Sequence, residues 1–209
     1  MALHIGDTAP NFVASTTQGE IEFHKWIGRS WAFFFSHPAD FTPVCTTEVG
    51  SVEQLANEFA YRNVKPIGLS TDTLDHHYAW LDDINDTHHT DMHFPLIADS
   101  DLKIARLYDM IHSEESDTMS VRSIFIIDPN KKIRIVMTYP MAVGRGLGEV
   151  LRVIDALRLS DKCGILTPAN WLPGEKVIIP NNVSNEEAMD RHLCGWEEVL
   201  PYMRTTYAD

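Results

Sequence analysis

The sequence predicts an α/β fold in which helices flank a central sheet. Short, almost uniformly apolar runs alternate along the chain with segments whose apolar residues recur at helical spacing. Strands that are apolar along their whole length are typical of a sheet covered by helices on both faces. Because 44% of the residues are apolar, the chain can bury a sizeable core, and a disordered chain is excluded.

The first half of the chain provides two predicted strands around one long helix. The run Trp-Ala-Phe-Phe-Phe at 31–35 is predicted to be a buried strand. Residues 43–61 are predicted to be a helix, because four apolar side chains share one face. These side chains are Val52, Leu55, Ala56 and Phe59. Residues 64–69 form the second strand candidate, and Pro66 favours an edge or strand-start position for it, since proline lacks the N–H of the ladder.

The remaining elements continue the alternation. Helices are predicted over 74–84, 102–107 and 147–159, and strands over 121–127 and 133–138, with an Asp-Pro-Asn-Lys turn between those two strands. After about residue 166 the chain becomes rich in proline and glycine and has little room for a separate core. We therefore predict a main domain over 1–166 and a C-terminal extension over 167–209 that packs on the main domain or on a second subunit.

Composition limits the possible partners and compartment. The 209 residues include 17 basic and 30 acidic side chains, a formal net charge of −13 that repels nucleic acid and anionic membranes. We see no secretory signal and no apolar run long enough to span a bilayer. The three cysteines form no Cys-x-x-Cys pair, and an odd count argues against a disulfide framework. The expectation is a soluble, cytoplasmic protein that binds neither nucleic acid nor membranes.

One cysteine lies between a predicted buried strand and a predicted helix. Residues 36–48 read Ser-His-Pro-Ala-Asp-Phe-Thr-Pro-Val-Cys-Thr-Thr-Glu. Thr42 suits the N-cap and Pro43 the first helical position. Cys45 then falls in the first helical turn, where unpaired backbone N–H groups and the helix dipole stabilise a thiolate. From this placement alone, Cys45 is either a reactive thiol or a small buried apolar side chain.

A family resemblance distinguishes these two interpretations. Pro38, Thr42 and Cys45 form Pro-x-x-x-Thr-x-x-Cys, and the segment around them resembles the one-cysteine (peroxiredoxin-six) subfamily of the peroxiredoxins, AhpC/TSA-like peroxidases. Further similar stretches extend over nearly the whole chain: Asp-Asp-Ile-Asn at 82–85, Phe-Pro at 94–95, Arg122 before a strand ending in Asp-Pro, Tyr-Pro at 139–140, Gly-Arg at 144–145 and Thr-Pro-Ala-Asn-Trp at 167–171. The resemblance implies a thioredoxin-like fold with a central mixed sheet, and no metal, haem or flavin cofactor.

The resemblance also implies roles for individual residues. Cys45 is the implied peroxidatic cysteine, whose thiolate reduces hydrogen peroxide or an organic hydroperoxide and becomes a sulfenic acid. Thr42 is implied to hydrogen-bond the peroxide and Pro38 to shield the site from water. Arg122 is implied to stabilise the thiolate and the leaving oxygen, as a fixed guanidinium beside sulfur can.

Three supporting residues complete the implied site: His37, Glu48 and Arg145. His37 is implied to lie beside the cysteine, and the alternative is a packing or hydrogen-bonding histidine. Glu48 is expected to orient Arg122 or Arg145, and the alternative is a favourable negative charge near a helix start.

The other cysteines bear on how the sulfenic acid is reduced. In the commonest two-cysteine peroxiredoxins, the resolving cysteine starts a Cys-Pro-Ala-x-x-Trp-like stretch, and Thr167 stands at that place here. Neither Cys163 nor Cys194 fits this motif. We therefore expect a one-cysteine mechanism with an external thiol, such as thioredoxin or glutathione, as reductant. The alternative is resolution by Cys194 of a partner subunit in a homodimer or a higher oligomer.

A second activity is found in some members of this subfamily, a phospholipase A2 activity that uses a Ser-His-Asp set. Ser30 and His24 stand at the matching places, but the serine lies in Gly-Arg-Ser-Trp-Ala, so Ala32 replaces the second glycine of a lipase-like motif. The acidic member would fall at Asn130, which cannot supply the charge that stabilises an imidazolium. A surface histidine and a loop serine are the favoured interpretation.

The histidines are not expected to bind metal. Two adjacent pairs, at 76–77 and 88–89, lie near His93. Adjacent residues of a helix diverge by about 100°, so such pairs chelate poorly. The second pair falls in a polar stretch, 85–91, that is predicted to be a loop.

Overall fold

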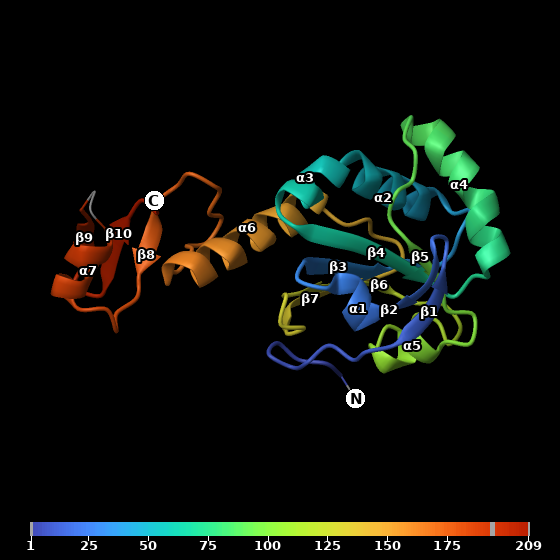
Figure 1. Ribbon diagram of the computed structural model, residues 1–209, viewed down its shortest axis with the longest axis horizontal. Coiled ribbons are helices and arrows are strands. Elements are labelled where there is room, and N and C mark those ends of the chain that lie inside the picture. The colour runs from blue at the N-terminus through green and yellow to red at the C-terminus, as the bar shows by residue number, and fades with distance from the viewer. Residues whose placement is uncertain (1, 193–194, 209) are drawn as a thin grey trace. The chain divides into compact units, whose positions relative to one another are not determined.

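The computed structural model describes residues 2–192 and 195–208 of the chain. Contacts between Cα atoms divide it into two compact units, Met1–Leu147 and Gly148–Asp209. The N-terminal unit is built on seven strands: β1 Val13–Thr16, β2 Gly19–Glu22, β3 Trp31–Ser36, β4 Val64–Ser70, β5 Leu96–Ala98, β6 Arg122–Ile127 and β7 Ile133–Tyr139. They form one mixed sheet in the order β2-β1-β5-β4-β3-β6-β7 (Figure 1). The β3–β4 and β4–β5 pairs are parallel, and the other pairs of this sheet are antiparallel.

Helices cover both faces of this sheet, as predicted (Figure 1). Helices α1 Phe23–Ile27 and α5 Lys103–Leu107 lie on one face, and α2 Pro43–Gln54, α3 Ala56–Tyr61 and α4 Leu74–His88 on the other. Strand β3 shows why both faces of the sheet must be covered by helices, because its successive side chains, apolar from Trp31 to Phe35, point to opposite faces. Phe34 packs against Phe23 of α1, whereas Phe33 stacks on Phe59 of α3. All six residues of β3 are buried, so the predicted buried strand is confirmed.

The edge position that Pro66 suggested for its strand is wrong, because β4 lies between β3 and β5. The local reason is the short length of β5, which pairs only with the last three residues of β4. The N–H of Gly68 points toward the β5 side, where it donates to the Pro95 carbonyl. Backbone groups two residues apart point to the same side of a strand. The nitrogen of Pro66 therefore faces the same side before β5 begins, so its missing N–H removes no ladder hydrogen bond.

Two predicted helical boundaries also differ from the structure. The helix predicted over 43–61 is divided at Leu55 into α2 and α3, and α4 continues to His88 instead of ending at 84. His88 is therefore helical, not part of the predicted polar loop. Its ring lies against Gly50 of α2 so closely that a Cβ atom added to Gly50 would lie 2.2 Å from the His88 Cγ. Glycine at this position permits the close approach of α2 and α4.

The C-terminal unit contains most of α6 Leu147–Cys163, then β8 Val177–Ile179, α7 Asn185–Arg191, β9 Glu197–Leu200 and β10 Met203–Thr206. Its strands form a separate antiparallel sheet in the order β8-β10-β9. The unit has two small apolar clusters. One contains Ile165, Trp171 and Val177 and is covered by residues of α6, and the other contains Ile179, Val183 and Ala188.

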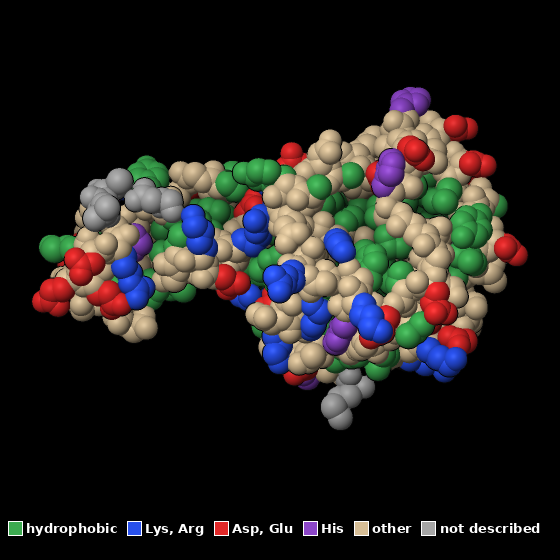
Figure 2. Space-filling view, in the orientation of Figure 1, with side chains coloured by type: hydrophobic (Ala, Val, Ile, Leu, Met, Phe, Trp, Pro, Cys, Tyr) green, Lys and Arg blue, Asp and Glu red, His purple; other side chains and the backbone are tan. Residues whose placement is uncertain are grey.

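The contact-based division falls at the start of α6, between Leu147 and Gly148, whereas the sequence placed the boundary at 166/167. The dimerisation role of 167–209 stays a prediction. Among the described residues, no helix is long and apolar enough to cross a membrane. The face shown in Figure 2 carries basic side chains among acidic ones, so the net charge of −13 does not make that face uniformly acidic.

Candidate active site

Cys45 lies in the first turn of α2, as predicted, and is fully buried. The connection from β3 brings the chain directly to it, because β3 ends at Ser36 and α2 begins at Pro43. Thr42 occupies the N-cap position with extended backbone, but its side chain does not cap the helix. Its hydroxyl instead donates to the Ala39 carbonyl at 2.9 Å. The predicted position of Thr42 is therefore confirmed, and the capping hydrogen bond expected from it is absent.

Among the residues that the structure describes, Arg122 is the one whose cationic group contacts the Cys45 sulfur. Its Nη1 donates to the Sγ atom at 3.3 Å and to Glu48 Oε2 at 2.6 Å. Its Nε and Nη2 both donate to the Met141 carbonyl, at 2.9 and 2.7 Å. The guanidinium is buried and held on both edges, so its positive charge has a fixed position beside the sulfur.

The sheet topology explains this meeting of residues 77 positions apart. Strands β3 and β6 are antiparallel, with Phe35 opposite Ile124. The end of β3, which leads to the cysteine, therefore lies beside the start of β6, which is Arg122. Strand β7 pairs Tyr139 with Arg122, so the Met141 carbonyl follows at the same end of the sheet. The sequence offered no local signal for this backbone acceptor.

Glu48 joins Arg122 to a second buried arginine. Arg145 donates to Glu48 Oε1 from its backbone N–H and its Nε, both at 2.8 Å, and to Oε2 from Nη2 at 2.7 Å. Its Nη1 donates to the carbonyls of Ser36 and Ser123. Burial alone would raise the pKa of Glu48, but hydrogen bonds and charge from Arg145, with the charge of Arg122, hold that pKa below its ordinary value. Two arginines and one carboxylate leave one net positive charge next to Cys45.

His37 and Pro38 are both buried in the segment before the helix. Burial lowers the pKa of His37 to about 4, although the nearby Asp40 carboxylate opposes that shift. The imidazole is therefore neutral at pH 7. Neither ring nitrogen has a hydrogen-bond partner within the described part of the chain, and the ring packs near Trp80 with centroids 5.2 Å apart.

Two residues that the sequence did not assign to the site lie in the same region. Asp40 and His77 are buried and joined by a hydrogen bond of 2.7 Å between Oδ2 and Nδ1. His77 comes from α4, one helical turn before Trp80, whose Nε1 donates to the Thr46 hydroxyl. The sequence predicted a helix here but could not indicate a buried ionic partner for its histidine.

The residues considered for a lipase activity bind other groups. The Ser30 hydroxyl donates to Asn63 Oδ1 at 2.8 Å, and the His24 Nε2 lies 2.8 Å from the Ala9 carbonyl. Asn130 belongs to the turn between β6 and β7, where its N–H donates to Asp128. Within the described residues, no hydrogen bond joins Ser30 to His24, so the pair lacks the contact on which a serine nucleophile depends.

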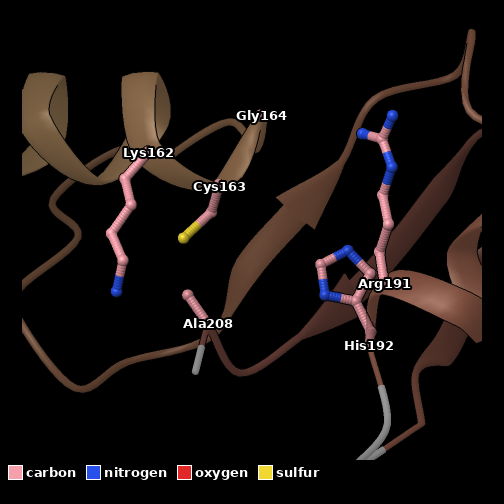
Figure 3. Close-up of a pocket in the computed structure, with 6 residues that line it drawn as sticks. All are labelled: Lys162, Cys163, Gly164, Arg191, His192 and Ala208. Atoms are coloured by element: carbon pink, nitrogen blue, oxygen red, sulfur yellow. The ribbon is translucent and has the colours of Figure 1, made fainter.

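The other cysteines lie in the C-terminal part of the chain. Cys163 is half-buried at the end of α6 and borders a pocket of about 390 Å³ (Figure 3). The pocket is lined by Lys162, Cys163, Gly164, Arg191, His192 and Ala208. Cys194, the alternative resolving cysteine, lies outside the described residues. Across ranges 2–192 and 195–208, no cluster of three or more His, Cys, Asp or Glu side chains could hold a metal ion.

A thioredoxin-like sheet that presents a buried cysteine at a helix start, with an arginine on its sulfur, defines a thiol peroxidase. The comparisons with known proteins agree. Residues 5–136 match the model of the AhpC/TSA family, and residues 156–193 match the C-terminal domain of 1-Cys peroxiredoxin. The chain belongs to the AhpC/TSA family and, within it, to the 1-Cys peroxiredoxins.

Individual relatives are similar over almost the whole chain. Peroxiredoxin PRX1, mitochondrial, of Saccharomyces cerevisiae is 49% identical, over 98% of this chain and 80% of that protein. The 1-Cys peroxiredoxin of Dictyostelium discoideum is 41% identical, over 98% and 85% respectively. A solved structure of a yeast mitochondrial 1-Cys peroxiredoxin, described for its thiol resolving mechanism via glutathione/thioredoxin systems, superimposes with a TM-score of 0.93. It is 48% identical, with 98% of this chain and 99% of that chain covered.

Proposed function

We propose that this peroxiredoxin reduces hydrogen peroxide and small organic hydroperoxides at Cys45. The observation that carries the proposal is the 3.3 Å contact between Arg122 Nη1 and the buried sulfur. The Cys45 thiolate attacks the terminal peroxide oxygen, an S–O bond forms, and the O–O bond breaks. The second oxygen leaves with the electron pair and takes a proton to become water or an alcohol, while Cys45 becomes a sulfenic acid.

The surrounding residues have distinct parts in this step. Because the Thr42 hydroxyl donates its hydrogen bond to the Ala39 carbonyl, its oxygen is available to accept a hydrogen bond from the peroxide O–H. Arg122 stabilises charge that develops on the leaving oxygen. Glu48 and Arg145 hold Arg122 in place, and buried Pro38 limits access of water. His37 is a neutral neighbour of this segment.

We assign reduction of the sulfenic acid to an external thiol. One thiol condenses with the sulfenic acid to give a mixed disulfide and water, and a second thiol releases Cys45 and a small disulfide. Thr167 at the usual resolving position and the glutathione/thioredoxin systems described for the yeast protein support this assignment. A Cys194→Ser variant tests it. Unchanged turnover with external thiol is expected, and a disulfide seen by non-reducing electrophoresis that this variant loses would contradict it.

The assembly and location are proposals of the same kind. We assign residues 1–166 to catalysis and 167–209 to homodimer formation, for which sedimentation of the chain with and without 167–209 is the test. A dimer that persists without those residues contradicts the assignment. We keep the cytoplasmic location as a prediction, although one similar relative is named as mitochondrial.

Stopped-flow measurement of Cys45 oxidation tests the peroxidase activity itself. Tryptophan fluorescence after mixing with hydrogen peroxide should change far faster than a free thiol reacts, and a Cys45→Ser variant should show no such phase. A wild-type rate equal to that of a free thiol would refute the proposal.

A further inference from the structure

The ring of His77 faces two hydrogen-bond acceptors. Its Nε2 lies 3.0 Å from the Ile97 carbonyl oxygen, and its Nδ1 lies 2.7 Å from Asp40 Oδ2. A carbonyl only accepts, so Nε2 must carry a proton. An ionised carboxylate also only accepts, so Nδ1 carries a proton when Asp40 is charged. The contacts of the pair are then those of an imidazolium and a carboxylate, both fully buried.

The charges around the pair favour this ionic form. Burial alone would lower the pKa of His77, but its hydrogen bond to Asp40, the Asp40 charge, the Ile97 carbonyl and the Asp72 charge raise that pKa above its ordinary value. His37 approaches Asp40 Oδ1 at 3.8 Å, and it is neutral at pH 7 because burial lowers its pKa. His77, Arg145 and Asp72 also act on His37 through their charges. Apart from the neutral His37, no second basic side chain pairs with Asp40 within the described chain.

Asp40 is anchored immediately before a strained residue. Its backbone N–H donates to Asp72 Oδ2 at 2.9 Å, while its side chain binds His77. The next residue, Phe41, has a φ of 55°, in the left-handed region. This conformation costs about 1–2 kcal/mol for a residue with a Cβ atom. Two anchors on Asp40 therefore supply the local constraint that keeps the chain in this turn.

The turn sets the position of the peroxide-binding hydroxyl. Thr42 directly follows Phe41, and its hydroxyl is directed by the Ala39 carbonyl within the same turn. Helix α4 also holds the start of α2, because Trp80 donates to the Thr46 hydroxyl, which in turn donates to the Thr42 carbonyl. Helix α4 thus contacts residues that precede and follow Thr42 in the sequence: His77 binds Asp40, and Trp80 binds Thr46.

We propose that Asp40 and His77 form a buried carboxylate–imidazolium pair that positions Thr42 for peroxide reduction. Both are positioning residues, since neither touches the Cys45 sulfur in the structure. The ion pair holds Asp40, Asp40 holds the left-handed turn at Phe41, and that turn aims the Thr42 hydroxyl. The inference rests on the proposed peroxidase function for its kinetic part, whereas the protonation state rests on the hydrogen-bond geometry and the charges around His77.

The protonation state is tested on the unmodified protein. In ¹⁵N-histidine-labelled protein at pH 7, both ring nitrogens of His77 should have imidazolium chemical shifts, assigned by their loss in His77→Gln. In Asp40→Asn the same ring should become neutral, with its proton on Nε2. A neutral His77 in the unmodified protein overturns the proposal, whatever the rate of peroxide reduction.

The positioning role is tested by the rate of Cys45 oxidation in variants of two buried carboxylates, Asp40 and the control Asp99. Asp40→Asn should slow Cys45 oxidation at least about tenfold, because small misplacements of an aligning group have effects of that size or larger. His77→Gln is the second variant and should slow it similarly. The control is Asp99→Asn, a buried carboxylate that caps α5 through the N–H groups of Ile104 and Ala105.

The control should keep the wild-type rate, even where it lowers the free energy of unfolding. Wild-type rates in whichever of the two test variants folds would overturn the positioning role while leaving the peroxidase function intact. A slow wild-type protein would instead remove the proposed function, and the NMR result would still decide the ion pair.

Discussion

Replacement of Glu48 by glutamine tests the buried arginine network most directly. Glu48 accepts four hydrogen bonds, three from Arg145 and one from Arg122. A glutamine of the same shape keeps one oxygen, which serves two of these donors. Its amide nitrogen then faces the other two N–H donors, so two charge-assisted hydrogen bonds are lost. At about 1.5–3 kcal/mol each, the loss amounts to roughly 3–6 kcal/mol of unfolding free energy, which overlaps the range of about 3–5 kcal/mol for breaking a buried ion pair.

The catalytic effect of Glu48→Gln should be smaller than the structural one. Arg122 keeps its two hydrogen bonds to the Met141 carbonyl, so its guanidinium stays near the sulfur. When the glutamine amide nitrogen takes the place of Oε2, however, the Nη1 group that touches Cys45 loses its carboxylate and meets an amide N–H₂. We expect the rate of Cys45 oxidation by peroxide to fall about 10- to 100-fold, or about 1.4–2.8 kcal/mol in the barrier. Urea unfolding of the reduced protein and stopped-flow fluorescence measure the two quantities.

Glu53→Gln is a matched control in the same helix. Glu53 is also buried, but within the described residues its carboxylate binds the backbone and ring of His93 alone, at 2.9 and 3.0 Å. It should lose about 1 kcal/mol of unfolding free energy and keep the wild-type oxidation rate. A Glu48→Gln protein that is no less stable than Glu53→Gln and whose Cys45 oxidises as fast as in the wild type would refute this role of Glu48.

Three further outcomes follow from other contacts. Gly50→Ala should lower the free energy of unfolding by about 1–3 kcal/mol, because its Cβ would overlap the His88 ring, and adding His88→Ala should restore most of it in thermal melts. Unfolded His37 binds a proton near pH 6.5, whereas the folded form does so only near pH 4, so its contribution to stability is complete above pH 6.5 and is lost as the pH falls to about 4. His37→Asn should remove that part of the pH dependence of urea unfolding, and an unchanged profile would contradict the assigned burial effect. Cys163→Ser should leave the oxidation rate of Cys45 unchanged in stopped flow, because the peroxide step uses none of its atoms.

Local sequence signals were sufficient where the determining contacts are local. Cys45 in the first turn of α2 follows from Pro43 and the preceding apolar strand, and the structure confirms it. Pro66 shows the opposite case. Its missing N–H correctly indicated a place without a ladder partner, but whether that place is a sheet edge depends on the length of β5, more than 25 residues further along the chain. Leu55 likewise divides one predicted helix into two, and of the four residues predicted to share its apolar face, Val52 and Phe59 are buried whereas Leu55 and Ala56 are half-buried.

The candidate site needed more than local signals, because its charges come from distant segments. Arg122, Glu48 and Arg145 were identified by resemblance to a family, since nothing within a few residues of each indicates a partner. Asp40 and His77 were missed for the same reason, as a histidine on a helix face looks alike whether it meets a carboxylate or packs in the core. Pairing of β3 with β6 is what converts these separate residues into one site.

The antiparallel pairing also explains why the cysteine and its arginine are supplied by these particular strand ends. A parallel neighbour such as β4 ends where β3 ends, so only its last residue and the loop after it reach the site. The antiparallel β6 instead begins there, and the backbone of its first residue, Arg122, is held by pairing with Tyr139 of β7. An arginine on a strand is held more firmly than one on a loop, and electrostatic stabilisation depends on a charge that needs no reorganisation during the reaction. Strand position, rather than charge alone, therefore suits Arg122 to act on the Cys45 sulfur.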